Sequence, residues 1–118
     1  MISERQIKEV LLQYERHGWN LRRVLLTAQT IKILTGSLKT LFGETEIILS
    51  EFDAVWFSRR SPNNYGSEAW ELRRLSGTPF ALVEVFEAED DESVREEARK
   101  EMEMLLIGQA SKFPNQQS

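Results

Sequence analysis

The chain has 118 residues, of which 41% are apolar and 29% charged, and its formal net charge is −4. This balance is that of an ordinary globular protein, and the length fits one domain. The sequence contains no cysteine, which excludes disulfides, thiol nucleophiles and thiolate metal sites. It has one histidine, which excludes histidine-rich metal sites.

The N-terminal residues lack the apolar core of a signal peptide, and the longest apolar runs are only a few residues long. We therefore expect a cytoplasmic protein that does not cross a membrane. The charge is uneven, since four basic residues accompany ten acidic residues from Ala81 onward. Such an acidic surface argues against nonspecific nucleic-acid binding, because it repels a phosphate backbone.

The first predicted element is a helix that begins after Ser3. Ser3 and Gln6 form an S-x-x-Q capping box. Ile2 and Ile7 occupy the two positions of a hydrophobic staple. Apolar residues at helical spacing continue the pattern, and Gly18 supplies a left-handed stop.

The next segment, residues 20–27, is predicted to be a strand whose second half is apolar on both faces. Residues 28–42 have two interpretations. Apolar residues at helical spacing favour a helix that ends at Gly43, whereas the sequence around Thr35-Gly36 suits a strand followed by a turn. We prefer the helix, which would cross over between two parallel strands.

Three further strand segments follow. Residues 46–59 are rich in β-branched and aromatic residues and are expected to kink near Ser50-Glu51. Two more strands are predicted at 69–75 and 80–86, because turn-forming residues at 76–79 separate them.

The last predicted element is a helix that opens at Asp90-Asp91 and ends at Gly108. Its buried stripe is expected to consist of Val94, Ala98, Met102, Leu105 and Leu106. The sequence therefore predicts an α+β fold, with a single mixed, mostly antiparallel β-sheet of about four or five strands. Helices at both ends of the chain and a short crossover helix would flank this sheet. Residues 1–109 would form one domain, and residues 110–118 a polar tail.

Three carboxylates on predicted strands form the first candidate site: Asp53, Glu71 and Glu84. Asp53 together with Glu71-Leu72-Arg73 resembles the D…E-x-K pattern of metal-dependent nucleases. Arg73 replaces the usual lysine, and arginine cannot give up its proton to act as a base. Carboxylates on one face could still hold Mg²⁺ for phosphodiester hydrolysis.

The register of the hairpin formed by the third and fourth strands decides whether these carboxylates meet. If Phe57 pairs with Trp70, then Asp53 and Glu71 point to opposite sides of the sheet. If Trp56 pairs with Trp70 instead, both carboxylates share one face. They would then be diagonal neighbours about 7–8 Å apart. Both registers match apolar residues with apolar residues, so the pattern leaves both open.

Charged residues on apolar faces form the second candidate site. Arg23 is expected on the same face as Leu21 and Leu25, and Arg74 on the same face as Trp70 and Leu72. A charge in such surroundings must be paired or reach solvent. One interpretation is a salt bridge of Glu84 with Arg74 or Arg23. The other is a pocket of Arg23, Arg74 and Trp70 for the carboxylate or phosphate of a small anionic ligand.

A third candidate site combines cations and aromatic rings. Arg59 and Arg60 precede the loop at 61–66, and Trp56 and Tyr65 lie nearby. Such mixtures are typical of interfaces with partners. Glycine-rich phosphate loops and cofactor motifs do not occur, so we expect no cofactor.

These observations together predict a non-enzymatic binding or protein-interaction module that binds a protein partner or forms a homodimer. The dimer is expected to form through the sheet surface between residues 52 and 86. The alternatives are a divalent-metal-dependent phosphodiesterase and a protein that binds a small anionic ligand.

Overall fold

The computed structural model describes residues 2–61 and 66–112. In this part of the chain, helices precede and follow the strands of one β-sheet. The elements in chain order are α1 (Glu4–Arg16), β1 (Asn20–Leu26), α2 (Ala28–Ile33), α3 (Leu38–Phe42), β2 (Glu46–Leu49), β3 (Ala54–Arg60), β4 (Glu68–Arg74), β5 (Ala81–Phe86) and α4 (Glu92–Lys112). The predicted α+β fold is confirmed.

The five strands form one mixed sheet in the order β2-β1-β3-β4-β5. β1 and β2 are parallel, and all other neighbours are antiparallel. The crossover between β1 and β2 is helical, as preferred, but it consists of two short helices, α2 and α3. The segment expected to kink near Ser50-Glu51 is interrupted there instead, and its two parts, β2 and β3, are separate strands on either side of β1.

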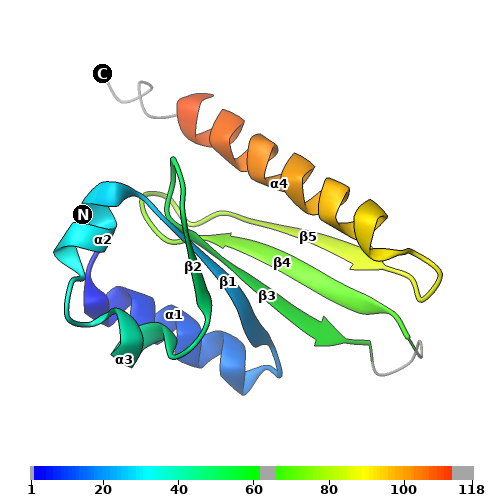
Figure 1. Cartoon of the computed structure of the whole chain (residues 1–118), viewed down its shortest axis with the longest axis horizontal. Coiled ribbons are helices and arrows are strands. Elements are labelled where there is room, and N and C mark those ends of the chain that lie inside the picture. The colour runs from blue at the N-terminus through cyan, green and yellow to red at the C-terminus, as the bar shows by residue number, and fades with distance from the viewer. Residues whose placement is uncertain (1, 62–65, 113–118) are drawn as a thin grey trace.

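Helices cover both faces of the sheet (Figure 1). One face packs against α4 through a cluster of apolar residues: Leu25, Phe52, Ala54, Trp56, Trp70, Leu72, Phe86, Met102 and Leu106. The other face packs against α1, α2 and α3 through a second cluster: Ile2, Ile7, Val24, Leu26, Leu34, Phe42, Val55 and Phe57. None of the helices in the described residues is long and apolar enough to cross a membrane.

The start of α1 follows the local signals of the sequence. Ser3 Oγ accepts a hydrogen bond from the Gln6 amide at 3.2 Å, and the Gln6 side chain bonds back to the Ser3 amide. Ile2 and Ile7 are both buried in the α1-side cluster, as the staple requires. Gly18, with a φ of 84°, ends the helix region. The predicted first helix is therefore confirmed.

Both registers expected for the β3–β4 hairpin are wrong. Trp56 pairs with Leu72, and Phe57 pairs with Glu71. Apolar matching across the strands was ambiguous, and the helices supply the additional constraint. In the observed register Trp56 and Leu72 face α4 together, while Phe57 stacks on Tyr14 of α1 with ring centroids 4.0 Å apart.

β1 contains a bulge that reverses an expectation about Arg23. Leu21 pairs with Phe57, whereas Arg23 pairs with Trp56, so Arg22 is an extra residue between them. As a result Leu21 packs on the α1 side, and Arg23 faces α4. The expectation that Leu21 and Arg23 share a face is wrong, because the bulge breaks the strict alternation of the strand.

α4 begins as predicted but differs from expectation in its end and its buried face. Asp91 Oδ1 accepts a hydrogen bond from the Val94 amide at 3.0 Å, which caps the helix. Gly108 does not end the helix, which continues to Lys112; residues 113–118 of the expected tail lie outside the described residues. Of the predicted stripe, Met102 and Leu106 are buried and Ala98 packs against the core, whereas Val94 and Leu105 are exposed and Arg99 is buried in addition.

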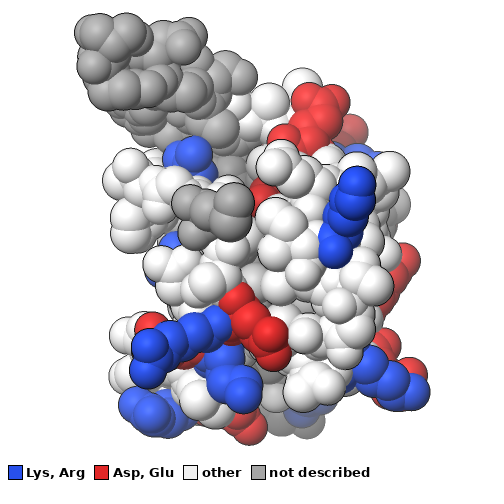
Figure 2. Space-filling view, turned by 90° about the vertical axis from the view of Figure 1, so that its left-hand side faces the viewer, with Lys and Arg blue, Asp and Glu red and all other residues white. Residues whose placement is uncertain are grey.

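Figure 2 shows the charge on one end of the molecule. Basic and acidic side chains gather together in the lower part of this view, at the level of α1 and α3 in Figure 1, and the middle is mostly uncharged. This end of the molecule therefore shows charges of both signs rather than a continuous patch of one sign.

Candidate functional site

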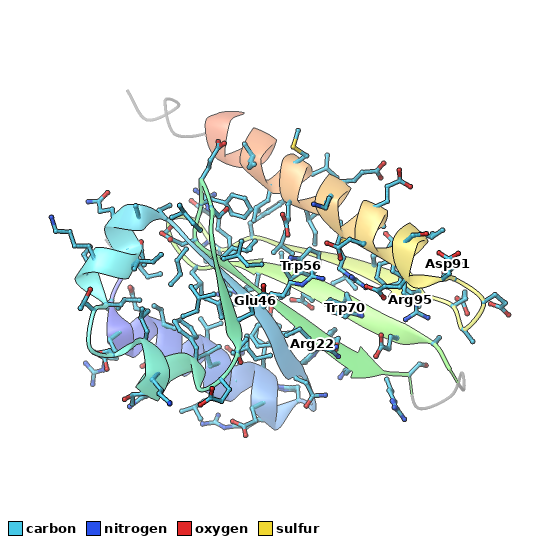
Figure 3. All side chains as sticks on the ribbon, viewed as in Figure 1. Arg22, Glu46, Trp56, Trp70, Asp91 and Arg95 are labelled. Atoms are coloured by element: carbon cyan, nitrogen blue, oxygen red, sulfur yellow. The ribbon has the colours of Figure 1, made fainter. Side chains whose placement is uncertain are left out.

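Trp70 lies at the centre of a charged cluster between the sheet and α4 (Figure 3). Its side chain is almost completely buried, at 4% exposure. The guanidinium carbons of Arg99, Arg22 and Arg23 lie 4.1, 4.9 and 5.9 Å from the centre of its ring. Cations at such distances are attracted by the negative face of an indole ring. The bulge in β1 makes this possible, because it brings both Arg22 and Arg23 to this side.

Carboxylates of α4 neutralise two of these arginines, Arg23 and Arg99. Arg23 Nη2 lies 2.8 Å from Glu96 Oε1, and Arg99 Nη1 lies 2.6 Å from the same oxygen. Arg99 also pairs with Glu92 at 2.9 Å. Burial alone would raise the pKa of Glu96, but the hydrogen bonds and charges of Arg23 and Arg99 outweigh burial and hold this pKa below its ordinary value.

The predicted anion pocket is only partly assembled. Arg23 and Trp70 come together, but the guanidinium of Arg74 lies elsewhere, against the turn after β4, where a Cβ on Gly77 would approach its Nη2 to 2.7 Å. The salt bridge expected for Arg23 exists, but its partner is Glu96 and not Glu84. Glu96 thus supplies the carboxylate that a ligand was expected to bring.

The structure does not bring the three candidate carboxylates together. Asp53 accepts hydrogen bonds from the Thr27 amide and the Thr30 hydroxyl, both at 2.8 Å, and so fixes the start of α2. Glu71 accepts a hydrogen bond from Tyr14.

Asp53 and Glu71 share the α1 side of the sheet, four pairs apart along the hairpin, which is about 13 Å at ~3.3 Å per residue. Glu84 pairs with Trp70 on the opposite side and is exposed. Within residues 2–61 and 66–112, no group of three histidine or acidic residues is placed to hold a metal ion.

The structure places the residues expected at an interface in different environments. Trp56 is fully buried, and its Nε1 donates to Glu103 at 2.8 Å, so its assignment to an interface is wrong. Arg59 is exposed, but it lies 4.6 Å from the centre of the Trp19 ring and donates to the His17 carbonyl at 2.9 Å. Tyr65 lies outside the described residues.

The aromatic residues that were expected to form the dimer surface are also buried within the chain. Phe52 and Phe86 both belong to the core cluster beneath α4. The sheet surface between them is therefore covered by a helix of the same chain, and it cannot serve a partner without displacing α4.

Arg60 is exposed and lines a cavity of about 350 Å³ at the end of the β3–β4 hairpin. The other residues that line it are Ser61, Gly66, Ser67, Glu68 and Arg95. Arg95 donates to Glu68 and to the backbone carbonyls of Glu87 and Asp90. The buried Ser67 hydroxyl has no hydrogen-bond partner among the described residues.

A second cavity, of about 330 Å³, lies at the end of α1. Its lining consists of Gln13, Tyr14, His17, Trp19, Glu71 and Arg73. Burial, with added contributions from the hydrogen bond and charge of Glu71, raises the pKa of Tyr14 well above its ordinary value. The Tyr14 hydroxyl therefore stays protonated and donates to Glu71. Tyr14 belongs to the apolar stripe of the first helix, but nothing in the sequence indicates its polar partner.

Beyond this cavity, part of the α1-side face of the sheet has no described helix over it. Val83 and Val85 of β5 lie on this face and are 55% and 50% exposed. Ala81 is also exposed, and Ala69 of β4 is half-buried beside Val85. We call these four residues the open face. Glu71, which pairs with Val83, marks its border with the cavity.

The open face ends at an edge strand whose backbone is available. β5 is last in the sheet order, and the Arg74 amide donates to the Phe80 carbonyl at 2.9 Å. Because backbone groups alternate in direction along an antiparallel strand, the amides and carbonyls of Ala81, Val83 and Val85 point away from β4. The sequence pattern predicted an alternating strand here, but it did not indicate that the strand lies at the edge of the sheet with an exposed face.

Comparison with known proteins adds no relative to these observations. The chain matches no protein-family model, no curated protein and no solved structure.

Proposed function

We propose that the protein is a non-enzymatic interaction module that binds an extended protein segment along the edge of β5. An added strand would bond to the outward-facing backbone groups of Ala81, Val83 and Val85. It would also extend the sheet beside the open face. The observation that carries this proposal is the pair of exposed valines on an edge strand that no described element covers.

The composition of β5 supports this proposal. Natural edge strands are usually blocked by a proline, a lysine, a bulge or a covering segment. The six residues of β5 include no proline and no lysine, and their pairing with β4 runs without a register shift. The opposite edge strand, β2, is shorter, with four residues. β5 is therefore the better template for an added strand.

The side chains of β5 define the chemistry of the bound segment. Val83 and Val85 require apolar residues at alternate positions of the added strand, on the side of the open face. On the other side the exposed Glu84 disfavours an acidic residue directly opposite it. The partner is thus an extended segment with alternating apolar residues.

The contacts of the other candidate residues favour this function over the two alternatives. Asp53 and Glu71 are engaged in hydrogen bonds that hold α2 and α1 on the sheet. Arg23 is engaged by Glu96, a residue of the same chain. These side chains have structural partners, whereas the edge of β5 has none among the described elements.

A synthetic peptide with the sequence of residues 79–88 tests the proposal, because it carries the alternation that β5 requires. Added in excess to dilute ¹⁵N-labelled protein, it should shift the amide signals of Ala81, Val83 and Val85 and slow their hydrogen exchange. Val83→Lys should weaken binding at least tenfold, since a lysine at an edge opposes strand addition.

Leu49→Lys is the matched control, because Leu49 is exposed at 68% on the opposite edge strand. This variant should bind the peptide like the unmodified protein. The proposal is wrong if the peptide does not bind, if Val83→Lys binds it equally well, or if the shifted amides lie in β2.

A further inference from the structure

We infer that the segment bound at β5 is β5 of a second copy of the chain, in an antiparallel pair centred on Val83. This inference rests on the proposed function, since it names the partner for the same edge. It follows from three properties of β5: the direction of its backbone groups, the position of its one charged residue, and the opposite charges at its two ends.

Backbone geometry restricts the register. Only Ala81, Val83 and Val85 have amides and carbonyls that point outward. In a symmetric antiparallel pair these residues must meet one another. Two registers give a long overlap: Val83 opposite Val83 of the second copy, or Val83 opposite Val85 of the second copy.

Charge selects between these two registers. The pairing of Val83 with Val85 places Glu84 directly opposite Glu84 of the second copy. These residues would form a non-hydrogen-bonded pair, in which Cα atoms are only about 4.5 Å apart and like charges are destabilising. The pairing of Val83 with itself instead places Glu84 opposite Leu82, and Ala81 opposite Val85. No like charges then face each other along the pair.

The two ends of β5 are complementary in an antiparallel arrangement. The segment after β5 is acidic, with Glu87, Glu89 and Asp90 preceding the residues that cap α4 and pair with Arg99. Before β5 lies the turn after β4, against which the Arg74 guanidinium packs. Antiparallel pairing brings the acidic end of each copy beside the arginine end of the other. This attraction occurs twice, because the arrangement is twofold symmetric.

The pair would join two five-stranded sheets into one continuous sheet. The open faces of the two copies would lie side by side and form one apolar band. The exposed β5 edge of each copy would then be paired with the other copy, and pairing or covering an edge is how natural proteins protect such strands.

Light scattering on the full chain gives the first test. We expect a mass near twice 13.7 kDa at high concentration. Val83→Lys should raise the dissociation constant at least tenfold, so that the variant is monomeric at the same concentration. Leu49→Lys should remain dimeric. Both residues are exposed, so neither substitution should prevent folding.

Cysteine substitution tests the register, because the natural chain has no cysteine to interfere. Cα atoms of a hydrogen-bonded pair lie about 5.5 Å apart, within the span of a disulfide. Val83→Cys should therefore form a disulfide-linked dimer when oxidised glutathione is added. Leu49→Cys should form none at the same concentration. In a mixture of Val83→Cys with a tagged Val85→Cys chain, the mixed dimer should be the minor product.

The outcomes separate this inference from the function on which it rests. A chain that stays monomeric up to millimolar concentration, with no Val83→Cys dimer, overturns self-pairing, while peptide binding at β5 would still support the interaction module. A dimer in which the mixed Val83→Cys and Val85→Cys product dominates overturns the register. A dimer dissociated by Leu49→Lys but not by Val83→Lys overturns both proposals.

Discussion

The helices on the two faces of the sheet are held by different kinds of side-chain contact. On the α4 side the indole of Trp70 is surrounded by three arginines, and carboxylates of α4 neutralise two of them. On the α1 side the core contacts are apolar and aromatic, and a hydrogen bond from Tyr14 to Glu71 lies at the border with β5. A buried charge needs partners, and Arg99 has Glu92 and Glu96, although its Nε has no hydrogen-bond partner among the described residues. The described helices of the α1 side leave Val83 and Val85 of β5 exposed.

The largest expected effect is a loss of stability on substitution of two neighbouring residues of β3 whose side chains point to opposite faces. Trp56→Ala and Phe57→Ala should each reduce the free energy of unfolding by about 3–5 kcal/mol, because each removes a buried aromatic ring. Urea unfolding measures both values, with Leu49→Ala as an exposed control. A reduction below about 1 kcal/mol for either variant would mean that its face contributes little to the fold.

Arg99→Met is expected to have a smaller effect and to concern only the α4 face. Arg99 is 1% exposed, and its loss would leave Glu92 without its partner and Glu96 with Arg23 alone. We expect a loss of about 2 kcal/mol in urea unfolding, in the range of hydrogen bonds to charged groups. Lys100→Met, at the next and exposed position, should change stability by less than about 0.5 kcal/mol. A variant as stable as the natural chain would show that packing, and not ion pairing, holds α4.

The smallest effect is a difference in pH dependence between the faces. The pKa of Glu96 lies below its ordinary value of 4.5, so its contribution to stability is complete above pH 4.5 and is lost as the pH falls further. The pKa of Tyr14 is raised above its ordinary value of 10.0, so its contribution is complete below pH 10 and is lost above it. Acid should weaken the α4 face, and alkali the α1 face.

Unfolding free energies measured as a function of pH check this expectation. Glu96→Gln should flatten the acid side of the profile, and Tyr14→Phe should flatten the alkaline side. Profiles in which neither variant changes its side would contradict the assignment of these groups.

Features that depend on neighbouring residues could be predicted from the sequence. The capping box of Ser3 and Gln6, the stop at Gly18 and the cap at Asp91 all rest on contacts within a few residues, and all are confirmed. The strands β4 and β5 are confirmed within a residue or so, because their alternation and the turn between them are also local signals.

Features that depend on distant elements could not be predicted. The hairpin register was ambiguous in its apolar pairs, and packing against helices on both faces distinguishes the observed one. The partner of Arg23 comes from α4, 73 positions along the chain. Arg99 was missed because apolar periodicity counts an arginine as exposed, although pairing with Glu92 and Glu96 allows it to be buried.

The bulge at Arg22 reverses the side of the sheet to which the preceding residues of β1 point. After the bulge, side chains alternate regularly between the two faces, and Leu25 faces α4. Before the bulge, Leu21 faces α1, although it lies four positions from Leu25 and would share its face in a regular strand. A regularly alternating β1 that kept all of its residues would place Leu21 on the same side as Arg23, so the extra residue is what allows Leu21 to meet α1. Deletion of Arg22 would join Leu21 to Arg23 and leave each opposite its present partner in β3, so the chain before β1 would keep its position while Trp70 lost one of its three arginines.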